Sequence, residues 1–267
     1  MDLSKAKYIL PNLFTLASVC TGFYSMILVS GADTVSQMSL AVWMLVISMV
    51  MDGLDGRVAR ATNTQSEFGV QLDSLADAIA FGVAPAFLVF KWGLEPLGFL
   101  GVLAGFAFVA CGIMRLARFN VQAAKATGPS KHFTGLPIPL AAGTLISVIL
   151  AHMTLTGKMQ TGGSGSAALM TLLLGGLMVS NVPYRTFKKI RLRGRAGFVL
   201  LGLVTYLIAG SATMGAGATF ASVLLLYIFI GLTEYTLGLR KRGRGIVEEA
   251  LGEDTDEELE ARKVEVD

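Results

Sequence analysis

The sequence predicts an all-α, polytopic integral membrane protein with about eight transmembrane helices. Of its 267 residues, 53% are hydrophobic and only 15% are charged, and the mean hydropathy is +0.63. A typical soluble domain is about one quarter charged. The charged residues are also segregated, so that long apolar runs lie between them. A transmembrane β-barrel would instead alternate over segments of about ten residues, and the sequence has no such pattern.

Eight apolar runs each come near the roughly 20 residues that cross a bilayer. They are residues 9–30, 38–60, 72–91, 97–116, 136–156, 167–183, 198–212 and 219–239. The first run is longer than the core of a signal peptide and no small-residue cleavage site follows it, so we expect a retained span. Glycines interrupt the sixth and seventh runs, which are therefore the weakest candidates.

Local signals set the boundaries of several runs. A short polar linker with Ser66, a residue type that caps helices, precedes the third run. Pro137 and Pro139 mark the entry to the fifth run. The connector 157–166 is rich in Gly and Ser and separates the fifth run from the sixth.

The distribution of Lys and Arg predicts the orientation. If the N-terminus is cytoplasmic and all eight runs cross, only Lys91 and Lys158 of the 22 basic residues lie outside. Cytoplasmic segments of membrane proteins carry the excess of Lys and Arg. We therefore expect both termini in the cytoplasm, a transmembrane domain over residues 1–239 and a charged cytoplasmic tail over residues 240–267.

Four aspartates stand out in this apolar chain. Asp52 and Asp55 are spaced i, i+3, and Asp73 and Asp77 are spaced i, i+4, so each pair shares one face of a helix. A carboxylate at the bilayer centre costs roughly 2.5–3.5 kcal/mol, so the cluster needs neutralisation. Hard divalent cations prefer oxygen ligands. The pattern therefore predicts a site for divalent cations between two helices, near the cytoplasmic interface.

Two chemistries fit such a site. Cations held by shared carboxylates suit phosphoryl transfer, and the membrane setting favours a lipid phosphate as substrate. Acids inside a membrane also mark ion pathways, so a cation transporter is the alternative. The clustering of all four acids near one face of the membrane favours the enzyme.

The spacing of these residues resembles the signature of the CDP-alcohol phosphotransferases, D-x2-D-G-x2-A-R-x8-G-x3-D-x3-D. All its fixed positions are filled, by Asp52, Asp55, Gly56, Ala59, Arg60, Gly69, Asp73 and Asp77. The signature covers about a tenth of the chain, and the multi-span layout around it also agrees with the family.

The resemblance implies transfer of a phosphatidyl-type group from a CDP-linked lipid to an alcohol, with release of CMP. The four aspartates would hold two divalent metal ions, Mg²⁺ or Mn²⁺, with Ca²⁺ as a further possibility. Asp77 would also act as general base on the acceptor hydroxyl. Small side chains and one arginine would line the CDP pocket, at Gly56, Ala59 and Arg60. Gly69 would let the two motif helices pack closely.

Three polar residues are further candidates for binding the CDP-lipid. Asn12 and Thr15 lie in a PNLFT stretch that resembles the N-terminal CDP-lipid contact of the family. Capping of the first helix beside Pro11 is an equal alternative for this stretch. Ser66, in the linker, could contact the substrate or cap the third helix.

The acceptor follows from looser matches. The stretches YILPNLFTLASVCTGFYS, RLARFNVQ and FTGLPIPLAAG resemble the phosphatidylserine synthase branch of the family. That branch would use CDP-diacylglycerol and L-serine; glycerol phosphate or inositol phosphate is the alternative acceptor. Candidates for binding the acceptor are Arg115, Arg118 and Asn120, although both arginines could simply be positive-inside anchors.

The resemblance also implies partners and a location. We expect a multi-pass protein of the inner (cytoplasmic) cell membrane, in contact with membrane lipid, with its active site at the cytoplasmic face. A homodimer is expected, and no nucleic-acid partner. Gly98, Gly101 and Gly105 could pack against a second copy or within one chain.

Overall fold

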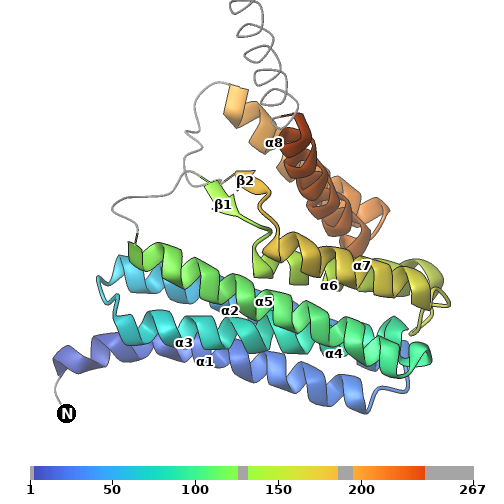
Figure 1. Cartoon of the computed structure of the whole chain (residues 1–267), viewed down its shortest axis with the longest axis horizontal. Coiled ribbons are helices and arrows are strands. Elements are labelled where there is room, and N and C mark those ends of the chain that lie inside the picture. Colours follow the sequence, from blue (N-terminus) through green and yellow to red (C-terminus); the bar gives the residue numbers. More distant parts are fainter. Residues whose placement is uncertain (1–2, 126–131, 186–194, 238–267) are drawn as a thin grey trace, which may run out of the picture. The chain divides into compact units, whose positions relative to one another are not determined.

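The structure is a computed structural model that describes residues 3–125, 132–185 and 195–237 (Figure 1). The predicted tail 240–267 lies outside the described residues. The main helices are α1 (Leu3–Ser30), α2 (Val35–Ala61), α3 (Glu67–Asp77), α4 (Ala84–Val89), α5 (Phe99–Lys125), α6 (Ile138–Thr156), α7 (Ser164–Val179) and α8 (Arg195–Thr213). A further helix covers Ala216–Leu237. The chain divides into two units, residues 1–226 and 227–267; of the second, residues 227–237 are described and are helical.

Six helical segments among the described residues are long and apolar enough to cross a membrane. They are Leu10–Ser30, Val35–Ala61, Glu67–Leu97, Phe99–Ala124, Ile138–Thr156 and Ala216–Leu237. The predicted sixth and seventh runs form shorter apolar helices, Ser164–Val179 and Gly202–Thr213. The prediction of an all-α polytopic membrane protein is confirmed, whereas the count of eight spans stays a prediction.

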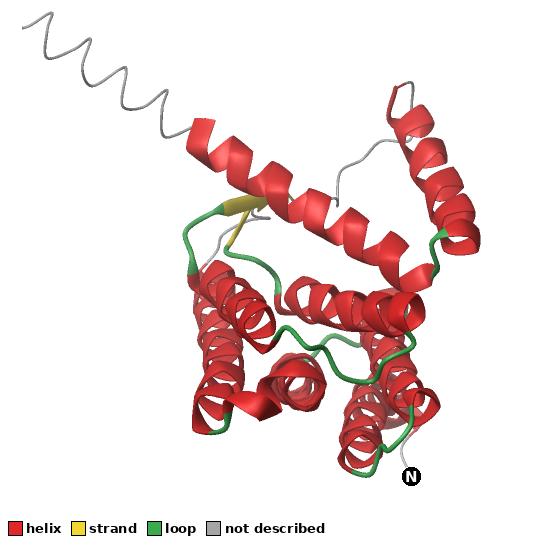
Figure 2. Ribbon diagram, turned by 90° about the vertical axis from the view of Figure 1, so that its right-hand side faces the viewer, coloured by secondary structure: helices red, strands yellow, loops and turns green. Residues whose placement is uncertain are grey.

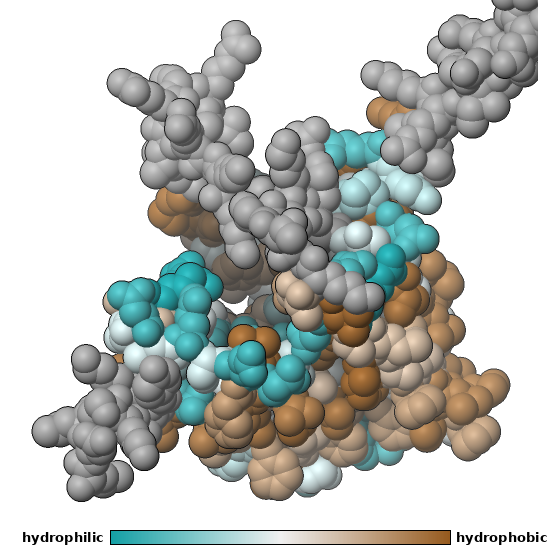
Figure 3. All heavy atoms as spheres, turned by 60° about the vertical axis from the view of Figure 1, so that its left-hand side comes forward, coloured by the Kyte–Doolittle hydropathy of each residue, from teal (hydrophilic) through white to brown (hydrophobic). Residues whose placement is uncertain are grey.

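Large apolar side chains lie on the outside of these helices. Phe99 is 74% exposed, and Leu100 and Phe106 are also well exposed. Figure 3 shows hydrophilic residues gathered in one band of the surface, with a broad hydrophobic surface beside it. Single exposed apolar residues are normal in soluble proteins, but extended apolar surface marks contact with lipid or another protein.

Helices α1 and α2 pack closely through small polar residues. Thr34 caps α2 in a reciprocal capping box with Gln37, and the turn before it joins the two helices. The Ser48 hydroxyl bonds the Ser18 carbonyl at 2.8 Å, and the Ser25 hydroxyl bonds the Ala41 carbonyl at 2.7 Å. Small residues at a helix interface let backbones approach, and their hydroxyls bond across it.

The third helical stretch, Glu67–Leu97, departs from regular α-helix at two places. It contains two π-helical turns, η1 (Ala78–Val83) and η2 (Phe90–Leu94), and a short 3₁₀ turn, η3 (Glu95–Leu97). Each π-turn ends two residues before a proline, Pro85 or Pro96. Proline donates no backbone hydrogen bond and its ring collides with the carbonyl four residues earlier, so a wider turn relieves the clash. The first of these turns begins directly after Asp77.

The end of α5 corrects one prediction. The sequence predicted a span that ends at residue 116, but α5 continues to Lys125. The residues after 116 include several good helix formers and neither Gly nor Pro before Gly128, so nothing stops the helix. Arg118 and Asn120 are therefore helical residues. On the same helix, Gly101 packs within the chain, because a Cβ there would collide with the Leu94 carbonyl.

Two short strands pair the segment before α6 with the segment after α7. Strand β1 (His132–Thr134) pairs antiparallel with β2 (Pro183–Arg185), with Phe133 opposite Tyr184 (Figure 2). Gly135 follows β1 with φ of 81°, a conformation that favours glycine. Its N–H bonds the Val182 carbonyl at 2.9 Å, which fastens the start of α6 beside the end of α7.

Candidate active site

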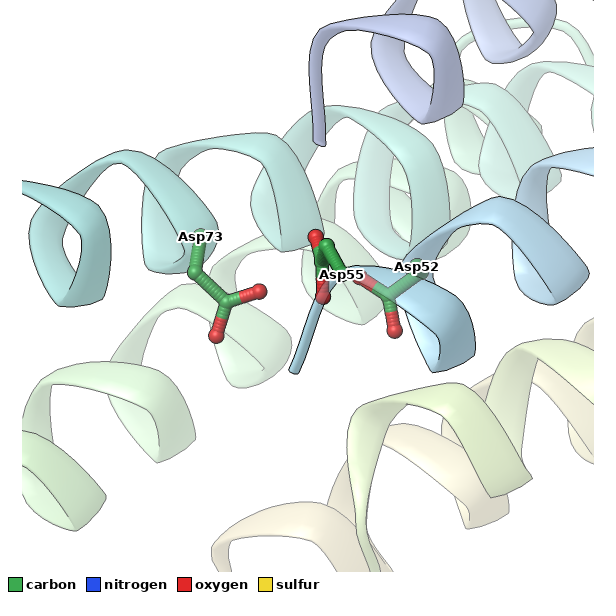
Figure 4. A group of neighbouring side chains, drawn as sticks. All are labelled: Asp52, Asp55 and Asp73. Atoms are coloured by element: carbon green, nitrogen blue, oxygen red, sulfur yellow. The ribbon is translucent and has the colours of Figure 1, made fainter. Parts of the chain in front are cut away.

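Helices α2 and α3 bring the aspartates together. One carboxylate oxygen each from Asp52, Asp55 and Asp73 lies within 4.8 Å of the other two. Figure 4 shows Asp52 and Asp55 on α2 and Asp73 reaching toward them from α3. Asp77 lies one turn beyond Asp73, and its side chain is within hydrogen-bonding reach of Asp52. The structure thus assembles all four residues that the spacing singled out.

The donor set fits a divalent cation. The Oδ1 atoms of Asp52 and Asp77 are buried and have no hydrogen-bond partner among the described residues. No Lys or Arg in the described part of the chain forms an ion pair with any of the four aspartates. Burying carboxylates without a partner is costly, and all the available ligand atoms are oxygens, which suit Mg²⁺, Mn²⁺ or Ca²⁺.

Helix α1 adds a direct contact to the cluster. Thr15 is only 4% exposed, and its hydroxyl donates to Asp55 Oδ2 at 2.6 Å. Thr15 Oγ1 also lies 3.2 Å from the Pro11 carbonyl oxygen of its own helix. Thr15 therefore supports one carboxylate of the cluster from the neighbouring helix. It is not a capping residue, because α1 begins well before it.

A cavity of about 470 Å³ opens beside the cluster. Its walls come from α1, α2, the linker between α2 and α3, and the start of α3. The lining residues are Pro11, Asn12, Thr15, Asp55, Gly56, Ala59, Arg60, Thr64, Gln65, Ser66, Glu67, Gly69, Val70 and Asp73. Every residue predicted to bind the CDP-lipid is among them, together with two of the four aspartates.

Two glycines, Gly56 and Gly69, line this cavity. A Cβ at Gly56 would lie in ordinary contact with the Arg60 guanidinium, at 3.5 Å. A Cβ at Gly69 would meet Ser66 Oγ at 3.2 Å and Asn12 Oδ1 at 3.7 Å. Gly69 therefore brings α3 close to α1, which corrects the expectation that it serves the packing of the two motif helices. Ser66 caps α3, accepting from the Gly69 N–H at 3.0 Å.

Helix α5 contributes no described residue to the cavity lining, but it contacts α3. Arg115 is only 8% exposed; its guanidinium interacts electrostatically with Asp77 and lies 5.4 Å from the centre of the Phe119 ring. Asn120 donates from Nδ2 to Ser74 Oγ at 2.8 Å. Two of the three predicted acceptor-binding residues therefore lie against the motif helix.

The third, Arg118, is directed elsewhere. It donates to the Val179 carbonyl at 3.3 Å and to Asn181 Oδ1 at 2.8 Å. These contacts fasten α5 to the end of α7. The geometry favours a structural role for Arg118, because both contacts engage its guanidinium away from the aspartates.

Sequence reasoning missed several residues of this site. Thr64, Gln65 and Glu67 line the cavity, and Ser74 contacts Asn120. All four lie at variable positions of the signature, so the motif gave them no weight. Their only signal was their place within a polar linker, or between two motif aspartates.

Comparison with known proteins gives consistent matches. Residues 8–183 match the CDP-alcohol phosphatidyltransferase family. The chain is 41% identical over 187 residues to a CDP-diacylglycerol–serine O-phosphatidyltransferase of Helicobacter pylori strain J99, covering 69% of this chain and 75% of the relative. It is 37% identical to an archaetidylserine synthase of Methanothermobacter thermautotrophicus, over 66% of this chain and 69% of that relative. A Mycobacterium tuberculosis protein with the same name as the first relative is 30% identical, over 83% of this chain and 74% of that relative.

Proposed function

Because this chain belongs to the CDP-alcohol phosphatidyltransferase family, we propose that it transfers the phosphatidyl group of CDP-diacylglycerol to L-serine, forming phosphatidylserine and CMP. Relatives named for serine transfer support the acceptor. One observation carries the proposal within this chain: a single cavity gathers the seven candidate nucleotide-binding residues and ends at the aspartates.

The cavity would hold the CDP part of the lipid. Arg60 is the basic residue among the described residues that line it, and its guanidinium is suited to a phosphate oxygen. Polar contacts to the nucleotide would come from Asn12, Thr15 and Ser66. The small residues Gly56, Ala59 and Gly69 leave space for the cytidine.

The aspartates would hold the cofactor. We propose that Asp52, Asp55, Asp73 and Asp77 bind two divalent ions, Mg²⁺ or Mn²⁺, with Ca²⁺ also compatible with oxygen ligands. Ions at this position would neutralise the diphosphate and the charge that develops on the CMP leaving group. The unpartnered buried oxygens of Asp52 and Asp77 support this role.

Asp77 would act as general base. It accepts the proton of the serine hydroxyl, whose oxygen then bonds to the phosphorus of the phosphatidyl group. The bond from that phosphorus to the CMP oxygen breaks, and CMP leaves. The cavity is lined from α1, α2 and α3, whereas Asp77 interacts with Arg115 of α5. Nucleotide and acceptor on different sides of the aspartates would suit in-line transfer.

Helix α5 would recognise the acceptor. Serine carries a carboxylate, and the buried guanidinium of Arg115 beside Asp77 is a suitable partner for it. Asn120, also on α5, bonds Ser74 of α3 and would contribute a polar contact to the acceptor. Arg118 would assist only by holding α5 in place.

The same proposal covers topology. The distribution of basic residues supports eight crossings, with both termini and the active site on the cytoplasmic side of the inner cell membrane. Residues 1–239 would form the catalytic membrane domain and 240–267 a tail. Serine and CMP could then exchange with the cytoplasm while both lipids stay in the bilayer. A homodimer is expected from the family resemblance.

An acceptor panel tests the function. Purified protein in detergent–lipid micelles would be given CDP-diacylglycerol with labelled L-serine, glycerol 3-phosphate or inositol phosphate, with and without a chelator. We expect lipid product and CMP only with serine, and none with the chelator. Product with another alcohol alone would overturn the acceptor, and cation flux without CMP release would favour the transporter alternative.

A further inference from the structure

Ser74 and Asn120 join the motif helix to α5. Asn120 Nδ2 donates to Ser74 Oγ at 2.8 Å. Ser74 precedes Asp77 by three residues, so the two side chains are neighbours on α3. Arg115, five residues before Asn120, interacts with Asp77 itself. Helix α5 therefore contacts α3 at Ser74, and its Arg115 acts electrostatically on the proposed base.

This hydrogen bond uses the Nδ2 donor of Asn120 and leaves its Oδ1 acceptor without a bond among the described residues. A side-chain amide offers N–H donors on one atom and a carbonyl acceptor on the other. Among the described residues Asn120 Oδ1 accepts no hydrogen bond, and this atom is not fully buried. Oδ1 is therefore accessible to a ligand.

We infer that Ser74 is a positioning residue: it orients the Asn120 amide so that Oδ1 accepts a hydrogen bond from the ammonium group of an amino-acid acceptor. This inference rests on the proposed function. With Nδ2 held by Ser74, the amide presents Oδ1, which carries its partial negative charge, to the ammonium group. Arg115 meets the carboxylate of the same acceptor, so the two residues together match a zwitterion.

Loss of the Ser74 hydroxyl has a specific consequence. The Asn120 amide can then rotate, and its N–H donors can face the ammonium group, which has no lone pair to accept them. An acceptor without an amino group makes no use of Oδ1 and is unaffected. The expected signature is a loss of discrimination between acceptors with and without an amino group.

The test compares L-serine with 3-hydroxypropionate, which is serine without its amino group. Each is measured with CDP-diacylglycerol, and 3-hydroxypropionate also as a competitive inhibitor of the serine reaction. In Ser74→Ala and in Asn120→Leu, the KM for serine should rise about tenfold, the effect of one hydrogen bond to a charged group. We expect little change in kcat or in the inhibition constant of 3-hydroxypropionate. Ser74→Thr keeps the hydroxyl and should restore the wild-type KM.

Ser30→Ala is the matched control, because Ser30 is exposed and bonds only its own helix, at the Ile27 carbonyl. Equal losses with both acceptors, or a Ser74→Ala variant with wild-type KM for serine, would overturn the inference. Should Ser74→Ala fail to fold, Asn120→Leu and Ser74→Thr still give the comparison. The proposed function fails separately, if the wild-type protein makes no phosphatidylserine.

Discussion

The hydroxyl of Thr15 donates a hydrogen bond of 2.6 Å to Asp55 Oδ2, across 40 residues of sequence. This contact ties α1, which lines the cavity beside the aspartates, to Asp55 of the carboxylate cluster. It also restrains the Asp55 carboxylate, one oxygen of which lies within 4.8 Å of oxygens of Asp52 and Asp73. The first helix is therefore part of the candidate active site.

Thr15→Val should weaken catalysis while preserving the fold. Valine has nearly the same shape but cannot donate to Asp55, and a hydrogen bond to a charged group contributes roughly 1.5–3 kcal/mol. We expect kcat/KM for CDP-diacylglycerol to fall about tenfold or more. The control is Thr21→Val, since the Thr21 hydroxyl bonds only backbone carbonyls of its own helix. Equal activity of the two variants would refute a role for Thr15 in the site.

Asp77→Asn should abolish CMP release. Asparagine keeps the size of the side chain but cannot take up a proton from the acceptor, and general-base catalysis contributes about 10²–10⁴-fold. Release of labelled CMP is the measurement, with size-exclusion chromatography to show that the variant still folds. Asp33→Asn is the control, because Asp33 lies exposed in the turn between α1 and α2. Asp77→Asn with wild-type turnover would remove Asp77 from the role of base.

Removal of divalent metal should stop the reaction, and restored metal should recover it. Asp52 has a buried oxygen without a protein partner, so we expect Asp52→Asn to raise the metal concentration needed for half-maximal activity. The measurement is a titration of chelated protein with Mn²⁺ or Mg²⁺ in both forms. Full activity in excess chelator, or identical titrations for the two proteins, would speak against a metal site at Asp52.

Gly69→Ala should affect the nucleotide side of the reaction. The added Cβ would lie 3.2 Å from Ser66 Oγ, closer than an ordinary contact, and would crowd the N-cap of α3 and the cavity wall. We expect a KM for CDP-diacylglycerol that rises several-fold, with a KM for serine near the wild-type value. Gly176→Ala is the control, because Gly176 is exposed and no atom lies within 4 Å of an added Cβ. Larger damage to serine use than to nucleotide use would contradict this assignment.

The sequence predicted the carboxylate cluster because its spacing is a local property. Residues three or four apart must share a helix face, so the pairing of Asp52 with Asp55 and of Asp73 with Asp77 needed no tertiary information. The N-cap at Ser66 was among its alternatives for the same reason. By contrast, nothing in the local sequence shows which helix lies opposite a given face. The partners of Ser74 and Arg118 depend on where α5 and α7 pack, and composition does not specify that.

The irregular third helix was open to prediction in part. Pro85 lies inside the predicted run 72–91 and Pro96 directly before the run 97–116, and a proline signals a local disturbance of a helix. They do not reveal whether the chain kinks, breaks or inserts a π-turn, because that depends on the packing around the freed carbonyls. The turn that begins after Asp77 could therefore be expected only as some departure from regular geometry.

Variants of Arg118 distinguish a role in binding the acceptor from a role in stabilising the fold. Its guanidinium bonds Asn181 Oδ1 and the Val179 carbonyl, so we expect Arg118→Ala to lower stability by about 1–2 kcal/mol, the range of side-chain hydrogen bonds. Asn181→Ala removes only the side-chain partner and should cost less. In the double variant the two losses should not add, because both remove the same bond.

Kinetics of the same variants complete the test. Arg115→Ala removes the guanidinium beside Asp77 and should raise the KM for serine strongly, whereas Arg118→Ala should change it little. Thermal unfolding in detergent and steady-state assays with serine give the two measurements for each protein. If Arg118→Ala raised the KM for serine as much as Arg115→Ala while leaving thermal stability intact, Arg118 would belong to the acceptor site. The contacts to α7 would then be secondary, and α5 would present two cationic groups to the acceptor.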